Sequence, residues 1–119
     1  MNKINLAAKL ASFEDVFSPK IVARYNDNKI AVVKAKGEFV WHKHDETDDF
    51  FLVVKGRLRI QLRGHDDVVL EPGELFVVPK GVEHCPRADE EVHILLIEPM
   101  GTANTGDAGG ALTAQEEVI

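Results

Sequence analysis

Three histidines and one aspartate are the residues whose types and spacing could carry chemistry in this chain. His42 and His44 are two positions apart, Asp49 follows five residues after His44, and His84 lies forty residues after His44. Because side chains alternate between the two faces of a strand, His42 and His44 are expected to point the same way. If all four side chains converge, they form a site for a divalent transition metal. Imidazole suits iron, copper, nickel and zinc, and a carboxylate extends the range towards manganese.

Short strands separated by Gly and Pro turns surround these four residues. From residue 37 onwards the expected strands are 39–44, 49–55, 57–63, 68–70, 75–78 and 92–98. Within 57–63 apolar and polar residues alternate strictly, as they do in a half-buried antiparallel strand. Many short strands joined by such turns favour a sandwich or a barrel. The expected fold class is therefore all-β.

The two ends of the chain have a different character. A short amphipathic helix is expected over residues 5–15, where apolar residues recur at helical spacing and Asn5 can cap the first amides. Strands are expected over 21–25 and 29–36, joined by a tight turn. The Gly-rich C-terminal part favours irregular structure or partial disorder after about residue 107, and the last four residues are expected to fray rather than to pair with a partner.

Length, charge and cysteine content limit the classes of protein that fit. A chain of 119 residues is long enough for one domain with a proper core. Its 20 acidic and 14 basic residues give a net charge of −6, which disfavours a nucleic-acid partner. The single cysteine, Cys85, excludes an internal disulfide and fits a reducing compartment. No stretch resembles a signal peptide or a membrane span, so we expect a cytoplasmic protein without a membrane partner.

Two groups of residues have the spacing of known motifs. The first group is Gly37, His42, His44, Asp49 and Gly56, and the second is Gly73, Pro79, Gly81 and His84. In both, the chain resembles the cupin superfamily, whose members are small double-stranded β-helix barrels of jelly-roll type. The chain departs from the family pattern in three places: one residue fewer precedes the first histidine, Asp49 replaces the usual glutamate, and Ala88 replaces an asparagine.

This resemblance implies a domain organisation and a set of metal ligands. It implies a single cupin domain over 1–119, with a barrel core at about 20–98, an N-terminal helical segment over 1–19 and an irregular tail over 99–119. The implied ligands of a divalent metal (Fe, Mn, Ni or Zn) are His42, His44, Asp49 and His84. Because aspartate is one methylene shorter than glutamate, either the backbone moves inward, or Asp49 lies near the metal without binding it. The tail resembles that of small stand-alone cupins often labelled as relatives of mannose-6-phosphate isomerase.

The function implied by the resemblance is a metal-dependent enzyme of dioxygenase, isomerase or lyase type acting on a small molecule. The alternatives are a non-catalytic cupin that binds a metal or a small ligand, and a purely structural barrel. A general base such as Glu38, Glu46 or Glu83 would have to reach the substrate, and spacing identifies none of them. We also expect a homodimer with residues 20–36 at the contact.

The other polar and aromatic residues are expected outside the site. They are His65 in a solvated turn, His93 in the last strand, Cys85 as a small buried residue, Trp41 in core or interface packing, and Arg57, Arg59 and Arg63 on an outward face. A sugar phosphate needs a convergent basic pocket, so outward arginines give the isomerase label little support.

Overall fold

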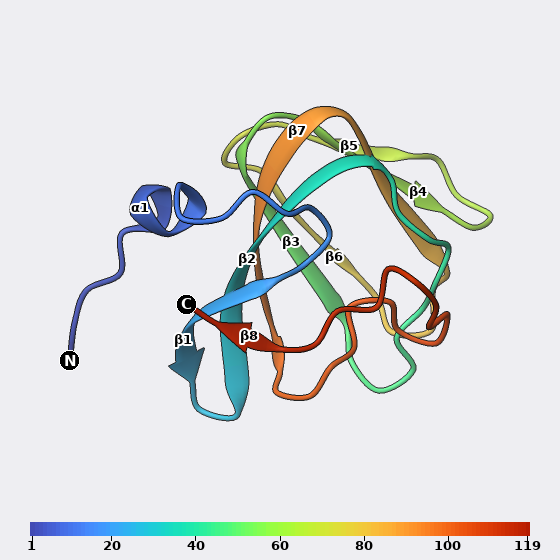
Figure 1. The fold of residues 1–119 in the computed structure, drawn as a ribbon. Helices are drawn as coiled ribbons and strands as arrows, with labels where there is room; N and C mark the ends of the chain where they lie inside the picture. The colour runs from blue at the N-terminus through green and yellow to red at the C-terminus, as the bar shows by residue number, and fades with distance from the viewer.

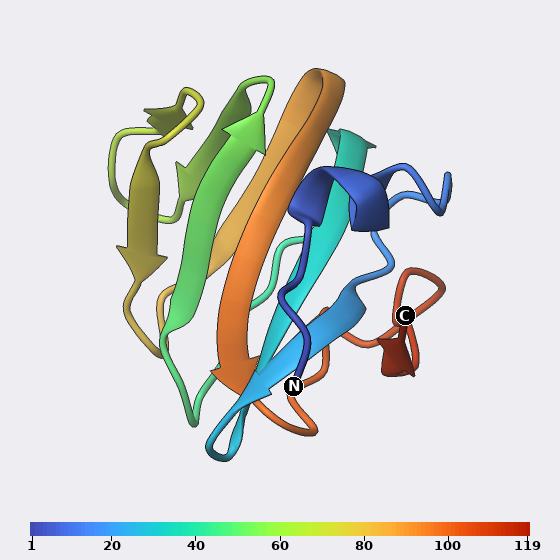
Figure 2. The same cartoon turned by 90° about the vertical axis from the view of Figure 1, so that its left-hand side faces the viewer.

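A single curled sheet of eight strands, with one short helix beside it, forms the protein (Figures 1 and 2). The computed structural model describes residues 1–119, and it confirms the expected all-β jelly-roll fold. The elements are α1 (Leu6–Leu10), β1 (Lys20–Tyr25), β2 (Asn28–Glu38), β3 (Asp49–Lys55), β4 (Leu58–Leu62), β5 (Val68–Leu70), β6 (Leu75–Val78), β7 (His84–Pro99) and β8 (Glu117–Val118).

The long strand β7 connects the two halves of the barrel. Along nearly its whole length it pairs with β2, from Asn28 opposite Pro99 to Glu38 opposite Arg87. On its other edge it pairs first with β4 and then with β3, so β7 must bend between these partners. Gly37 has a φ of +85° at the register shift in β2, a backbone conformation that glycine adopts without steric cost. The bend encloses the interior in which the site lies.

The barrel core is apolar and follows the alternation seen in the sequence. Leu58 and Ile60 on β4 are fully buried, and burial of such side chains contributes roughly 2 kcal/mol each. The arginines between and beside them face outward as expected. Arg57 pairs with an exposed glutamate, Glu71, and Arg59 pairs with Asp67. Arg57 and Arg59 share a depression of the outer face with Arg87 and with two acidic residues, Asp89 and Glu90, and none of the three arginines lines the cavity inside the barrel.

The N-terminal helix is shorter than expected. Asn5 caps α1 as predicted, because its Oδ1 accepts a hydrogen bond of 3.0 Å from the backbone N–H of Ala8. The helix ends at Leu10 instead of residue 15. A helix of five residues has little stability of its own, and burial of Leu10 against Val22 and Val32 fixes it on the outside of the barrel. No helix of the protein reaches the length and hydrophobicity needed to cross a membrane.

The C-terminal residues pack back onto the barrel, so the expectation of frayed final residues is wrong. β8 pairs in parallel with the start of β1, and the N–H of Ile119 donates to the carbonyl of Ile21 at 3.0 Å. The buried ammonium of Lys20 contacts Glu117 at 2.6 Å, which ties the two strands together. In Figure 1 the preceding segment crosses the lower end of the barrel before it returns to β1.

Candidate metal centre

The first two histidines lie in an irregular segment between β2 and β3. The expected strand over 39–44 is wrong, because β2 ends at Glu38 and only His42 forms an isolated bridge, with His84 at the start of β7. The N–H of His42 donates to the carbonyl of His84 at 3.0 Å, and the N–H of His84 donates to that of His42 at 2.8 Å. This reciprocal bridge brings two distant parts of the sequence together, with the imidazole centres 4.4 Å apart.

The structure brings all four predicted residues into one buried cluster. Their nearest potential ligand atoms all lie within 4.8 Å of one another. Asp49 lies among the histidines, with its Oδ2 atom 2.8 Å from Nε2 of His84, 3.3 Å from Nε2 of His44 and 3.9 Å from Nε2 of His42. The shorter aspartate side chain therefore still reaches the histidines. It does so from the first position of β3.

Backbone carbonyls fix the orientation of two of the rings. Nδ1 of His42 lies 2.9 Å from the carbonyl oxygen of Val40, and Nδ1 of His84 lies 2.9 Å from that of Val82. A carbonyl oxygen only accepts hydrogen bonds, so in both rings Nδ1 carries the proton. Nε2 of each ring is then the nitrogen that faces the cluster, and in the metal-free protein that of His84 donates to Oδ2 of Asp49. Histidines that bind metals are commonly oriented by such a bond from the other ring nitrogen.

Burial and the central carboxylate shift the pKa values of the cluster residues away from their ordinary values. Burial lowers the pKa of His42 to about 4, so this ring is neutral at neutral pH. Burial also lowers the pKa of His44, but the hydrogen bond and charge of Asp49 outweigh it and raise the pKa above its ordinary value. For Asp49 burial raises the pKa, yet the hydrogen bonds from His44 and His84 prevail and lower it to about 2. The carboxylate is thus ionised over the whole physiological range.

The donor set fits a divalent transition metal. It offers imidazole nitrogens and one carboxylate oxygen, buried and converging from two segments of the chain. Buried charge needs a partner of opposite sign, and a dication can take the place of the proton that His44 and Asp49 otherwise share. The cluster can therefore bind a metal, and iron, manganese, nickel and zinc all suit these ligands.

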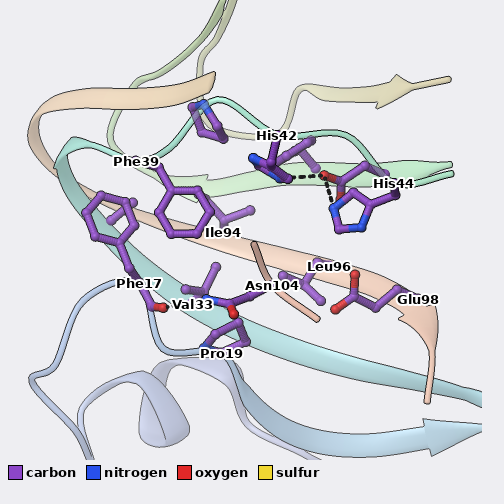
Figure 3. Close-up of a pocket in the computed structure, with 14 residues that line it drawn as sticks. Phe17, Pro19, Val33, Phe39, His42, His44, Ile94, Leu96, Glu98 and Asn104 are labelled. Carbon is purple, nitrogen blue, oxygen red and sulfur yellow. Dashed lines mark hydrogen bonds and ion pairs between the residues drawn. The ribbon is translucent and has the colours of Figure 1, made fainter. Parts of the chain in front are cut away.

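A small cavity adjoins the cluster. It has a volume of about 60 Å³, and His42, His44 and Asp49 form part of its wall. Figure 3 shows Phe17 and Phe39 towards one end, with His44 and Glu98 towards the other. The rest of the lining is mostly apolar. A cavity of this size admits a few water molecules or a small organic molecule.

Among the polar residues of the cavity that sequence reasoning missed is the buried Glu98. Its side chain is 6% exposed and pairs with the equally buried Lys29, with 3.3 Å between Nζ and Oε1. The signal was present in the sequence, because Ile94, Leu96 and Glu98 stand at alternate positions of β7 and share its inner face. The glutamates considered as candidate bases are all exposed and do not line the cavity: Glu38, Glu46 and Glu83.

The other expectations for polar residues hold in the structure. His65 is exposed in its turn, and His93 turns away from the cluster to contact Glu91 at 2.8 Å. Cys85 is fully buried, and burial raises the pKa of its thiol to about 11. Trp41 is partly buried beneath the guanidinium of Arg63, 4.3 Å above its ring.

The barrel and its histidine cluster are those of a cupin, and comparison with known proteins agrees. The model of the family described as "Cupin domain" matches residues 29–98, more than half of the chain, so the protein belongs to the cupin family. A cupin-2 domain containing protein from Shewanella frigidimarina NCIMB 400 is similar, with 46% identity, a TM-score of 0.79 and coverage of 81% of this chain and 93% of that one. Protein NMB1881 from Neisseria meningitidis is 31% identical, with a TM-score of 0.75 and coverage of 82% and 99%.

A sequence relative is the uncharacterized protein YdbB of Bacillus subtilis (strain 168), which is 30% identical over 67 residues. The matched region is 56% of this chain and 59% of YdbB, so the chain spans less than two thirds of the length of that relative. These similarities establish the family and the fold, and the chemistry has to be argued from the site.

Proposed function

We propose that this protein is a metal-dependent enzyme acting on a small molecule, with a divalent transition ion held by His42, His44, Asp49 and His84. The observation that carries the proposal is the position of the cluster: three of its four members line the cavity, so the site faces the place where a ligand would lie. A metal bound there would act as a Lewis acid that polarises and orients an oxygen of the ligand.

The protein's own residues prepare this site in two ways. The carbonyls of Val40 and Val82 hold two imidazoles with Nε2 directed inward, so little reorganisation is needed on binding. The apolar wall that includes Phe17 and Phe39 keeps bulk water away. In a water-poor cavity the attraction between charged groups and a polar ligand is stronger than in solvent.

Metal content tests the first half of the proposal. Metal-free protein is incubated separately with iron(II), manganese, nickel and zinc, freed of excess ion, and analysed for bound metal. We expect about one ion per chain in the wild type and loss of the ion in His42→Ala and in His84→Ala. His65→Ala is the matched control, because His65 is exposed in a turn and belongs to no cluster. Equal metal content in all four proteins would contradict the assigned ligands.

Turnover tests the second half and separates the two candidate functions. An enzyme of dioxygenase, isomerase or lyase type loses activity on small carbonyl compounds or phenols in the two site variants and keeps it in the control. The alternative, a non-catalytic cupin module, is favoured by the extensive pairing of polar groups around the cluster, and it predicts ligand binding without turnover. Metal uptake with binding but no product would establish that alternative.

The proposal extends to a cytoplasmic homodimer. Support for the dimer comes from β1, whose outer edge is covered by β8 only at Lys20 and Ile21 and which carries the exposed Tyr25 beyond them. Unpaired strand edges are sites of association. Light scattering after size exclusion is expected to give twice the chain mass, and a monomer at all concentrations would refute the contact. The single buried thiol is compatible with a reducing compartment.

A further inference from the structure

Glu98 is a buried carboxyl group in the cavity and is not one of the four proposed metal ligands. It lines the same cavity as His42, His44 and Asp49, and its side chain is 6% exposed. Its one ion pair is with Lys29, whose ammonium also contacts Glu116 of the C-terminal segment at 3.0 Å and donates to a backbone carbonyl. Figure 3 shows the carboxylate extending from β7 among the residues of the cavity wall.

The lining determines what charge a ligand can carry. Its fourteen residues include no lysine and no arginine, and the two carboxyl groups present are those of Asp49 and Glu98. Lys29 lies behind Glu98 and is already occupied by two carboxylates. Apart from the proposed metal ion, whose charge Asp49 already offsets in part, a phosphate or carboxylate ligand would meet no free cation in this lining. The lining therefore favours a small neutral molecule over a sugar phosphate.

We propose that Glu98 is the proton-transferring catalytic residue of this site, and that the substrate is a small neutral carbonyl compound with a C–H bond beside the carbonyl. This inference rests on the proposed function, in which a single bound metal ion would orient the carbonyl oxygen. The Glu98 carboxylate takes the proton from the carbon next to the carbonyl. The C–H electron pair becomes the carbon–carbon double bond of an enolate, while the carbonyl π pair moves to oxygen.

The reverse transfer completes the reaction without an oxidant or reductant. The protonated Glu98 returns its proton to the same carbon, or to the former carbonyl carbon. In the second case, for an α-hydroxyketone, the hydroxyl proton passes to the other oxygen. Hydroxyacetone would thus be converted into its isomer lactaldehyde, with all atoms and electrons conserved. Glu98 serves as base and then as acid at carbon, while the second proton moves between the two oxygens of the enediolate itself, so no second protein group is required.

The charged surroundings of Glu98 suit both halves of this cycle. Burial raises the pKa of Glu98 to about 7, and the negative charge of Asp49 on β3 adds to this rise. The positive charge of Lys29 on β2 and the ring of His44 act in the opposite direction and lower the pKa. Both protonation forms are then populated near neutrality, which is the condition for efficient acid–base catalysis. Glu116 acts from the C-terminal segment through Lys29, which it shares with Glu98. Lys29 is accordingly a positioning residue.

The first test needs neither metal nor substrate. Infrared spectra of metal-free wild type and Glu98→Gln are compared from pH 4 to pH 9, and the protonated carboxyl band absent from the variant is followed. We expect this band to titrate near pH 7 in the wild type. In Glu116→Gln, where Lys29 is shared with one carboxylate fewer, the midpoint should move to lower pH. A midpoint below about 5 would overturn the inference.

The second test follows hydrogen exchange into hydroxyacetone in deuterium oxide by NMR, with protein restored with each metal in turn. Glu98→Gln is expected to retain its metal and its fold, and to lose at least about 100-fold in exchange rate. Glu83→Gln, the same change at an exposed glutamate, should match the wild type. Equal rates in wild type and Glu98→Gln, or no exchange by metal-containing wild type, would overturn the role of Glu98 and leave the metal site standing. Failure to take up any metal would instead refute the proposed function, and this inference with it.

Discussion

The ionisation of Glu98 is expected to make the stability of the metal-free protein depend on pH in a measurable way. Burial raises its pKa from the ordinary value of 4.5 to about 7. Because the folded protein holds this proton more tightly than the unfolded chain does, the stabilising contribution is complete below pH 4.5 and is lost as the pH rises through about 7. At about 1.4 kcal/mol per pKa unit, the free energy of unfolding loses about 3 kcal/mol over this range. The side chain is 6% exposed, so solvent screens little of this effect.

His42 contributes the opposite slope in nearly the same range. Its pKa is lowered by burial from 6.5 to about 4, so the unfolded chain binds this proton more tightly. Its contribution is present above pH 6.5 and is lost as the pH falls through about 4. The two slopes offset each other in the wild type, whose stability should be nearly level between about pH 4.5 and 6.5. In Glu98→Gln the slope from His42 remains alone.

Urea unfolding of chelator-treated wild type and Glu98→Gln at several values between pH 4.5 and pH 8 checks this prediction. The difference in unfolding free energy should shift by about 3 kcal/mol in favour of the variant as the pH rises. Glu83→Gln should run parallel to the wild type, since Glu83 is exposed. If the curves for wild type and Glu98→Gln stay parallel within about 0.5 kcal/mol, the reasoning about the buried carboxyl is wrong.

Three further predictions concern packing and metal binding. Gly106→Ala should lose roughly 1–3 kcal/mol of stability by urea unfolding, because the added Cβ would collide with the carbonyl of Lys43. The control Gly109→Ala should lose less, because position 109 has a similar φ but open space around the added Cβ. Leu58→Ala should cost about 2–5 kcal/mol in the same assay, whereas the exposed Val69→Ala should stay within about 0.5 kcal/mol. Zinc at a hundred times its Kd should add about 2.7 kcal/mol to the unfolding free energy, with a raised melting temperature in calorimetry and no rise when chelator is present.

The strands whose residues alternate strictly or form short apolar runs were predicted closely. The expected bounds of 49–55, 68–70 and 75–78 coincide with β3, β5 and β6. The closing strand was expected to begin at residue 92, but β7 begins at His84. Pro86 and the acidic residues 89–91 interrupt the apolar pattern of its first half, so the sequence does not predict a strand there. That half is extended because β2 and β4 pair with it from both sides, which no local pattern reveals.

The final residues show the same limit of local patterns. Their Gly-rich composition predicts fraying, because they carry too little apolar surface to fold alone. In the structure they are ordered by partners that lie far away in the sequence. Lys20 contacts Glu117 and Lys29 contacts Glu116. Both lysines are almost completely buried, and a buried cation without a carboxylate partner is costly.

The sequence by itself determined the fold class and the candidate metal donors, since both follow from residue types and short-range spacing. The candidate donors predicted in this way are His42, His44, Asp49 and His84. Only the tertiary structure decided which ring nitrogens face the cluster and that a buried glutamate shares its cavity. The physical reason is that spacing along a strand fixes direction, whereas the distance between segments depends on strand register and on packing of the whole chain.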